Sequence, residues 1–130
     1  MQILQPPGWP RPKGYSNGVV ASGKMVFVSG IIGWDKTETI VSDYFAEQFR
    51  QVLKNTLAIL AEANAKPSNI VRMTAYITNR EEYLEAARSL APIWQEIMGM
   101  HYPAMAFVQV AGLLEPRAKV EIETTAMIPS

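Results

Sequence analysis

The stretch that decides the fold is residues 101–128, HYPAMAFVQVAGLLEPRAKVEIETTAMI. It contains two runs in which apolar and polar residues alternate, Met105–Val110 and Ala118–Ala126. This two-residue period is typical of β-strands, and the short segment between the runs predicts a tight connection between neighbouring strands. The second run carries Glu121 and Glu123, two residues apart, so both carboxylates are expected on one face of the sheet.

The N-terminal part of the chain predicts an extended arm followed by a hairpin. Four prolines precede Gly14, so this arm is expected to form neither a helix nor a regular ladder of backbone hydrogen bonds. Val19–Ala21 and Met25–Val28 are rich in β-formers and flank the turn-like Ser22–Lys24. We therefore expect these two runs to pair with each other.

Two helices are predicted in the middle of the chain. The first runs from an N-cap at Ser42 or Asp43 to Asn64, with apolar residues at helical spacing, and it is stopped by Pro67. A strand follows over Ile70–Thr78. The second helix begins at Asn79, which has a glutamate three residues later, the spacing of a capping box.

This order of elements predicts an α+β fold in one domain over residues 1–130, a mixed β-sheet with two helices packed on one face. The other face of such a sheet would carry many apolar side chains. Burial of that face against further copies of the chain would remove it from water, so we expect an oligomer.

Composition excludes several classes of partner. The chain has 12 basic and 12 acidic residues without a run of either sign, so nucleic acid is not an expected partner. It has no cysteine, and no apolar stretch approaches the roughly 20 residues that a membrane span requires. We expect a soluble, cytoplasmic protein that does not bind membranes.

Few residues are suited to catalysis. The chain has one histidine, His101, no Gly-x-Ser-x-Gly elbow, no metal-ligand spacing and no phosphate-binding glycine loop, so no metal or cofactor is expected. Glu121 and Glu123 fit either a solvated strand face or a site in which a carboxylate positions water. Tyr15 and Trp34 fit either packing or a site beside the glycine-rich turns.

The order and spacing of several short motifs resemble the RidA/YjgF/UK114 family over nearly the whole chain. These motifs are Tyr15–Val19, Val28-Ser29-Gly30, Pro103-Ala104 and Val120–Glu123. The resemblance implies a chorismate-mutase-like fold, a homotrimer, and a small-molecule ligand in a cleft between subunits. It also implies a hydrolase, an enamine/imine deaminase that converts reactive imines to keto acids and ammonia.

The resemblance assigns roles to individual residues. Glu121 stands at the position of the glutamate that holds water, and Tyr15 at that of the tyrosine that closes the pocket. Substrate-binding positions correspond to Ser29, Gly30, Ile31, Trp34, Met105 and Phe107. Met105 replaces the arginine that grips the substrate carboxylate in the family, and Phe107 replaces a small residue, which places the chain in an arginine-less branch.

A carboxylate buried against Met105 would remain unsatisfied, at a cost of several kcal/mol. Either another cation reaches the cleft, or the ligand is neutral and apolar, and the sequence favours the second alternative. The candidate cations are Arg11, Lys13, His101 and Arg117.

Two functions follow from this substitution. The first is a hydrolase of a neutral or differently charged imine or enamine, with weak or no activity on 2-iminobutanoate. The alternative is a trimeric module that binds a small molecule and has lost the deaminase chemistry. A ribonuclease activity is disfavoured, because the net charge is zero and the chain lacks a pair of histidines.

Overall fold

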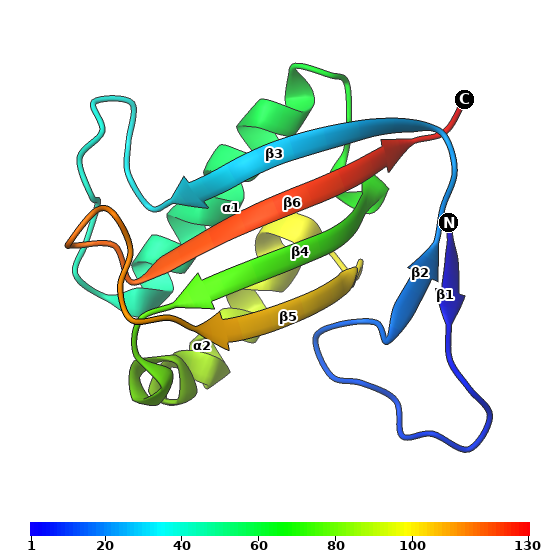
Figure 1. The fold of residues 1–130 in the computed structure, drawn as a ribbon, viewed down its shortest axis with the longest axis horizontal. Helices are drawn as coiled ribbons and strands as arrows, with labels where there is room; N and C mark the ends of the chain where they lie inside the picture. The colour runs from blue at the N-terminus through cyan, green and yellow to red at the C-terminus, as the bar shows by residue number, and fades with distance from the viewer.

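The computed structural model describes residues 1–130 and shows a four-stranded mixed sheet with both helices on one of its faces (Figure 1). The sheet consists of β3 (Lys24–Ile32), β4 (Ile70–Ile77), β5 (Ala104–Gln109) and β6 (Val120–Ile128), and the helices are α1 (Phe45–Ala61) and α2 (Arg80–Met98). The strand order is β3-β6-β4-β5, with β5 parallel to β4 and the other pairs antiparallel. The predicted α+β class is confirmed. Neither helix is long and apolar enough to cross a membrane.

The core lies between the sheet and the helices. On β6, Val120, Ile122 and Ala126 have no exposed surface, whereas the intervening Glu121 and Glu123 are not buried. Strand β4 follows the same alternation, and the buried apolar side chains of both helices belong to the same core as those of β4 and β6. The alternation predicted for the last strand is therefore confirmed, and it places the two carboxylates on the sheet face opposite the helices, which we call the open face.

The predicted tight pairing of the last two strands is wrong, because β4 lies between β5 and β6. The connection, residues 110–119, crosses the end of β4 instead of forming a hairpin turn (Figure 1). Burial explains this order. Ile70, Met73 and Ala75 of β4 have almost no exposed surface, which suits a central strand, whereas Val108 of β5 is exposed at the sheet edge.

The predicted N-terminal hairpin also does not form. β2 (Gly18–Val20) pairs with β1 (Gln2–Leu4), and β3 pairs with β6. Gly23, with φ of 134°, lies against the carbonyl of Ile128, where a side chain would collide, so the chain passes over the end of β6 before β3 begins. The N-terminal arm was predicted to form no regular ladder of backbone hydrogen bonds. This prediction is wrong for β1, because the residues of β1 precede the first proline and pair with β2.

The helix boundaries lie close to the predicted ones. The N-cap of α1 is Tyr44, because Asp43 is engaged by Arg117 and the Ser42 hydroxyl accepts a hydrogen bond from the Tyr44 amide. The start of α2 agrees with the prediction, since the Asn79 side chain accepts a hydrogen bond from the amide of Glu82 at 3.0 Å.

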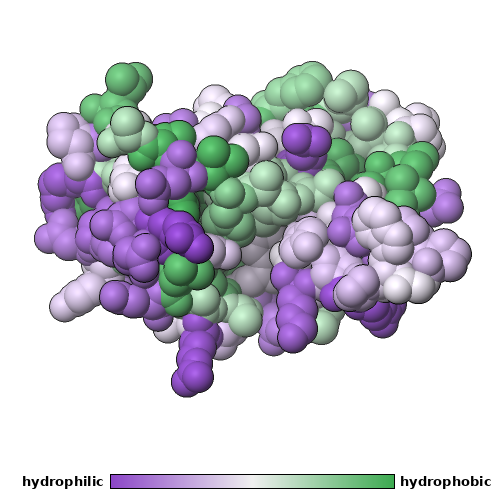
Figure 2. Space-filling model, turned by 60° about the horizontal axis from the view of Figure 1, so that its bottom comes forward, coloured by the Kyte–Doolittle hydropathy of each residue, from purple (hydrophilic) through white to green (hydrophobic).

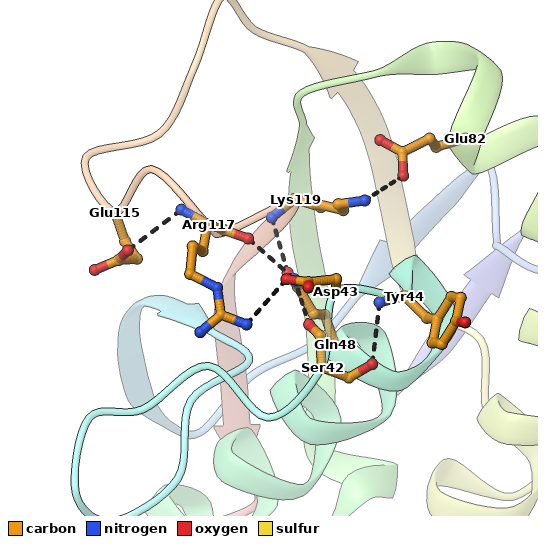
Figure 3. A network of polar contacts seen from close by, with 8 residues as sticks. All are labelled: Ser42, Asp43, Tyr44, Gln48, Glu82, Glu115, Arg117 and Lys119. Carbon is orange, nitrogen blue, oxygen red and sulfur yellow. Dashed lines mark hydrogen bonds and ion pairs between the residues drawn. The ribbon is translucent and has the colours of Figure 1, made fainter.

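A buried glutamine fastens the β5–β6 connection to the helices (Figure 3). Gln48 is completely buried; its amide nitrogen donates to the carbonyls of Ser42 (2.8 Å) and Arg117 (3.0 Å), and its oxygen accepts from the Lys119 amide (2.8 Å). Two ion pairs surround it, Arg117–Asp43 at 2.9 Å and Lys119–Glu82 at 2.5 Å. The hydrogen bond from Arg117 lowers the pKa of the Asp43 carboxyl.

We expect Gln48→Met to destabilise the protein by about 2–4 kcal/mol, because it leaves the Ser42 and Arg117 carbonyls and the Lys119 amide without a partner inside the protein. Urea unfolding measures the loss. The control is Gln51→Met, which removes one bond to Asn55 at a half-buried position and should cost less than about 1 kcal/mol. Equal losses for both variants would show that Gln48 does not anchor the connection.

Candidate functional site

A groove of about 750 Å³ lies between α2 and β5, with the N-terminal arm along one side. Most of its lining is apolar, and it is completed by Lys13, Gly14, Arg88 and Gln95. Figure 2 brings this edge of the molecule toward the viewer and shows hydrophobic surface around a recess near the middle of the face. A concave, mostly apolar site with a few polar groups has the form of a small-molecule pocket.

Aromatic pairs wall the groove. Tyr83 of α2 packs on Phe107 of β5 with ring centroids 4.6 Å apart, and Trp94 of α2 stacks on Tyr102 at 6.1 Å. Met105 of β5 lies between Tyr102 and Phe107 in the sequence and also lines the groove. On α2, Ala87 and Ala91 line the groove between Tyr83 and Trp94. The small alanine side chains leave the space that the groove occupies.

Ser16 fastens the arm to the groove. Its amide donates to the Pro103 carbonyl at 3.0 Å, its hydroxyl donates to the Tyr102 carbonyl at 2.5 Å, and the residue is buried. Gly14, with φ of 80°, turns the chain just before this point. These contacts hold Tyr15, which is 43% exposed, at the rim of the groove.

The open face carries a second group of polar residues. The Tyr76 hydroxyl donates to Glu123 at 2.6 Å, whereas the carboxylate of Glu121 has no hydrogen-bond or ion-pair partner within the protomer. A Cβ atom on Gly30 would lie 2.5 Å from Glu121 Oε2, so only glycine lets this carboxylate lie against β3. Of the two glutamates, Glu121 is therefore the one available to a ligand.

Within one protomer, the residues assigned by resemblance form separate groups. Met105, Phe107 and Tyr15 line the groove on the helix side, because Met105 is in register with the buried Met73. Glu121 lies on the open face with the exposed Ser29 and Gly30. The side chain of Ile31 packs against the main core, and Trp34 packs in a small cluster with Ile32, Ile40 and Ala118.

The four candidate cations also lie in different parts of the structure. His101 Nε2 lies 2.6 Å from the Ile70 carbonyl, Arg117 pairs with Asp43, and Arg11 is an exposed residue of the arm. Lys13 lines the groove. The sequence reasoning missed Arg88, the other cation there, although its place beside the apolar stripe of α2 was a signal that could have identified it.

We expect Glu123→Gln to lower the pKa of Tyr76 toward its ordinary value. The hydrogen bond to Glu123 is the main cause of the raised pKa of Tyr76, because it stabilises the protonated phenol next to a negative charge. NMR titration of the Tyr76 ring signals measures the change. Glu121→Gln, which removes a more minor electrostatic influence, should lower this pKa less; an equal effect of both variants would contradict the hydrogen-bonded pairing.

Comparisons with known proteins define the class. Residues 10–128 match the family described as Endoribonuclease L-PSP. A RutC family protein from Aquifex aeolicus is 35% identical over 98% of this chain and 99% of its own length. The human 2-iminobutanoate/2-iminopropanoate deaminase is 30% identical over 87% of this chain and 79% of its own length. The chain belongs to the RidA/YjgF/UK114 family.

Solved structures agree with this assignment. The Rid family protein YyfB from Yersinia pestis, whose function is unknown, superposes with a TM-score of 0.86 at 28% identity, and 98% of each chain is covered. TdcF from E. coli, solved with bound serine, has a TM-score of 0.69 at 32% identity, covering 98% of this chain and 99% of its own. The predicted Rid fold is therefore confirmed, and at least one member of the family binds a small molecule.

Proposed function

We propose that the protein hydrolyses a reactive imine or enamine in a site formed between two protomers of a homotrimer. The observation that carries this proposal is the unpartnered Glu121 carboxylate, held against Gly30 on the open face. The deaminase name of the human relative supports the reaction class. Met105 at the position of the family arginine supports an arginine-less branch of the family.

A site between protomers is supported by the separation of the candidate residues into two groups on opposite faces of the sheet. Glu121, Ser29 and Gly30 lie on the open face of the sheet, whereas Tyr15, Met105 and Phe107 line the groove on its other side. The open face also exposes Met25 (51%) and Phe27 (70%), which favours its burial against another copy of the chain. In such an assembly, Glu121 of one protomer would face the groove of the next.

The proposed reaction needs one base and one water molecule. Glu121 accepts a proton from the water as its oxygen bonds to the imine carbon, which gives a carbinolamine. This proton passes to the nitrogen to complete the carbinolamine. Glu121 then accepts the proton of the carbinolamine hydroxyl and transfers it to the nitrogen, the carbon–nitrogen bond breaks, and ammonia leaves as the carbonyl forms. The sum is R₂C=NH + H₂O → R₂C=O + NH₃. Tyr15 at the rim of the groove covers the reacting group and limits access of solvent.

We expect Glu121→Gln to reduce imine hydrolysis by about a hundredfold or more, because an amide cannot accept the proton from water. Imines are generated from single amino acids by an amino-acid oxidase, and the fraction that escapes hydrolysis is trapped with semicarbazide. The matched control is Glu123→Gln on the same strand face, which should retain activity within a few-fold because Glu123 is already bonded to Tyr76.

One observation favours a second function, a binding module without catalysis, and that observation is Met105 in place of the arginine. Absence of hydrolysis by the parent protein across aliphatic and aromatic imines would establish this second function. Full activity of Glu121→Gln would instead show that another group activates water.

We expect the parent protein to have the mass of a trimer at micromolar concentration in light scattering. The open face is more polar than the sequence predicted, but Phe27 is exposed on it. Phe27→Asp should reduce the mass to that of a monomer, because it replaces this aromatic side chain with a charge that would be buried between protomers. The control is Leu114→Asp, a fully exposed position in the β5–β6 connection, which should leave the mass unchanged. A monomeric parent protein would contradict the proposed site, since the two groups of residues could not meet.

A further inference from the structure

We propose that Arg88, assisted by Lys13, binds the carboxylate of an imino acid or 2-oxo acid that has a large apolar side chain. The cation is thus supplied by α2 and not by β5, where Met105 stands. This inference rests on the proposed function, because it assigns the ligand of the same site.

The charge of the groove is the first argument. Arg88 and Lys13 are its only charged residues, and no aspartate or glutamate lines it. Neither side chain has an ion-pair or hydrogen-bond partner, whereas Arg50 and Arg117 are both paired with carboxylates. An anion bound in this groove would therefore have two cations and no competing carboxylate among the lining residues.

The place of Arg88 on the helix is the second argument. Arg88 follows Ala87 and precedes Ala91 by three residues, so it lies next to the small side chains that leave the groove open. It is exposed and can lay its aliphatic stem along this apolar surface while the guanidinium faces the ligand. Gln95, two turns further along α2, adds a neutral donor on the same side of the groove.

The size and lining of the groove indicate the rest of the ligand. The groove of a single protomer has ten apolar lining residues, more than a four-carbon acid can contact. Its walls are the pairs Tyr83–Phe107 and Trp94–Tyr102, together with Met105, which offer contact to an aromatic or long aliphatic side chain. The ligand therefore combines a carboxylate near Arg88 with an apolar tail between the aromatic pairs.

This proposal replaces the neutral ligand that the sequence favoured. That preference rested on Met105 and on the apolar residues expected around it, and the candidate cations included none on α2. With Arg88 and Lys13 at the groove, a carboxylate has partners, and Met105 becomes part of the contact surface for the tail. Weak activity on 2-iminobutanoate is still expected, since its short side chain leaves the aromatic walls unfilled.

The test is calorimetric titration of the assembled protein with 2-oxo-4-phenylbutanoate and with its ethyl ester, which keeps the tail and removes the charge. Arg88→Ala should weaken the affinity for the acid at least about tenfold and change that for the ester less than about twofold. Arg88→Lys should weaken it less than Arg88→Ala, because it keeps the charge but loses the bidentate geometry.

The matched control is Arg80→Ala, which removes an exposed arginine of the same helix outside the groove and should leave both affinities unchanged. Light scattering of each variant confirms that the assembly is intact. The proposal is overturned if the parent protein does not bind the acid, if Arg88→Ala binds it as tightly as the parent, or if this variant loses acid and ester equally.

Glu121→Gln separates this inference from the proposed function. It should retain binding of the acid while losing hydrolysis, since Arg88 and not Glu121 holds the carboxylate. Loss of acid binding in Arg88→Ala together with full hydrolysis in Glu121→Gln would support the ligand assignment and refute the reaction. Hydrolysis that depends on Glu121 but is unaffected by Arg88→Ala, even for imines with a carboxylate, would support the reaction and refute the ligand assignment.

Discussion

The alternation along β6 is the constraint on which the rest of the structure depends. Val120, Ile122 and Ala126 point into the core without exposed surface, so Glu121 and Glu123 must lie on the opposite face. Because β6 is hydrogen-bonded to β3 on one side and β4 on the other, a shift by one residue would bury both carboxylates among apolar side chains. The cost of burying those charges fixes the register, and with it the position of Glu121 beside Gly30.

Alternation and helical spacing predicted most elements but not all of their neighbours. Both helices and the strands at Ile70–Ile77 and Val120–Ile128 lie close to the predicted ranges, since each has a strong period in its own residues. Pairing was predicted wrongly for β2 and for β5. The period of a strand shows which of its faces is buried, but it contains no information about which other strand lies beside it.

The arrangement of the site could not be predicted from the pattern of single elements either. Resemblance to the family motifs assigned Glu121, Tyr15 and Met105 to the candidate site, but it did not show that Glu121 and Met105 face opposite sides of the sheet. Their relation depends on the register of β4 with both neighbours: Tyr76 pairs with Glu121 on one face, whereas Met73 pairs with Met105 on the other. No single strand contains that information, and Arg88 was missed because the groove exists only once α2 lies against β5.

The proposed exchange of a cation on β5 for one on α2 changes the shape of the site as well as its charge. A strand residue at the position of Met105 stands between the two aromatic pairs, so an arginine there would place its charge in the middle of the apolar groove. Arg88 approaches from the side of the helix, beside Ala87 and Ala91, and leaves the middle to Met105 and Phe107. Moving the charge to one side joins the two aromatic pairs into one continuous apolar surface. A carboxylate held at that side would leave room for a longer tail than a charge in the centre allows, so the proposed exchange of cations changes the size of the expected substrate without requiring a different reaction.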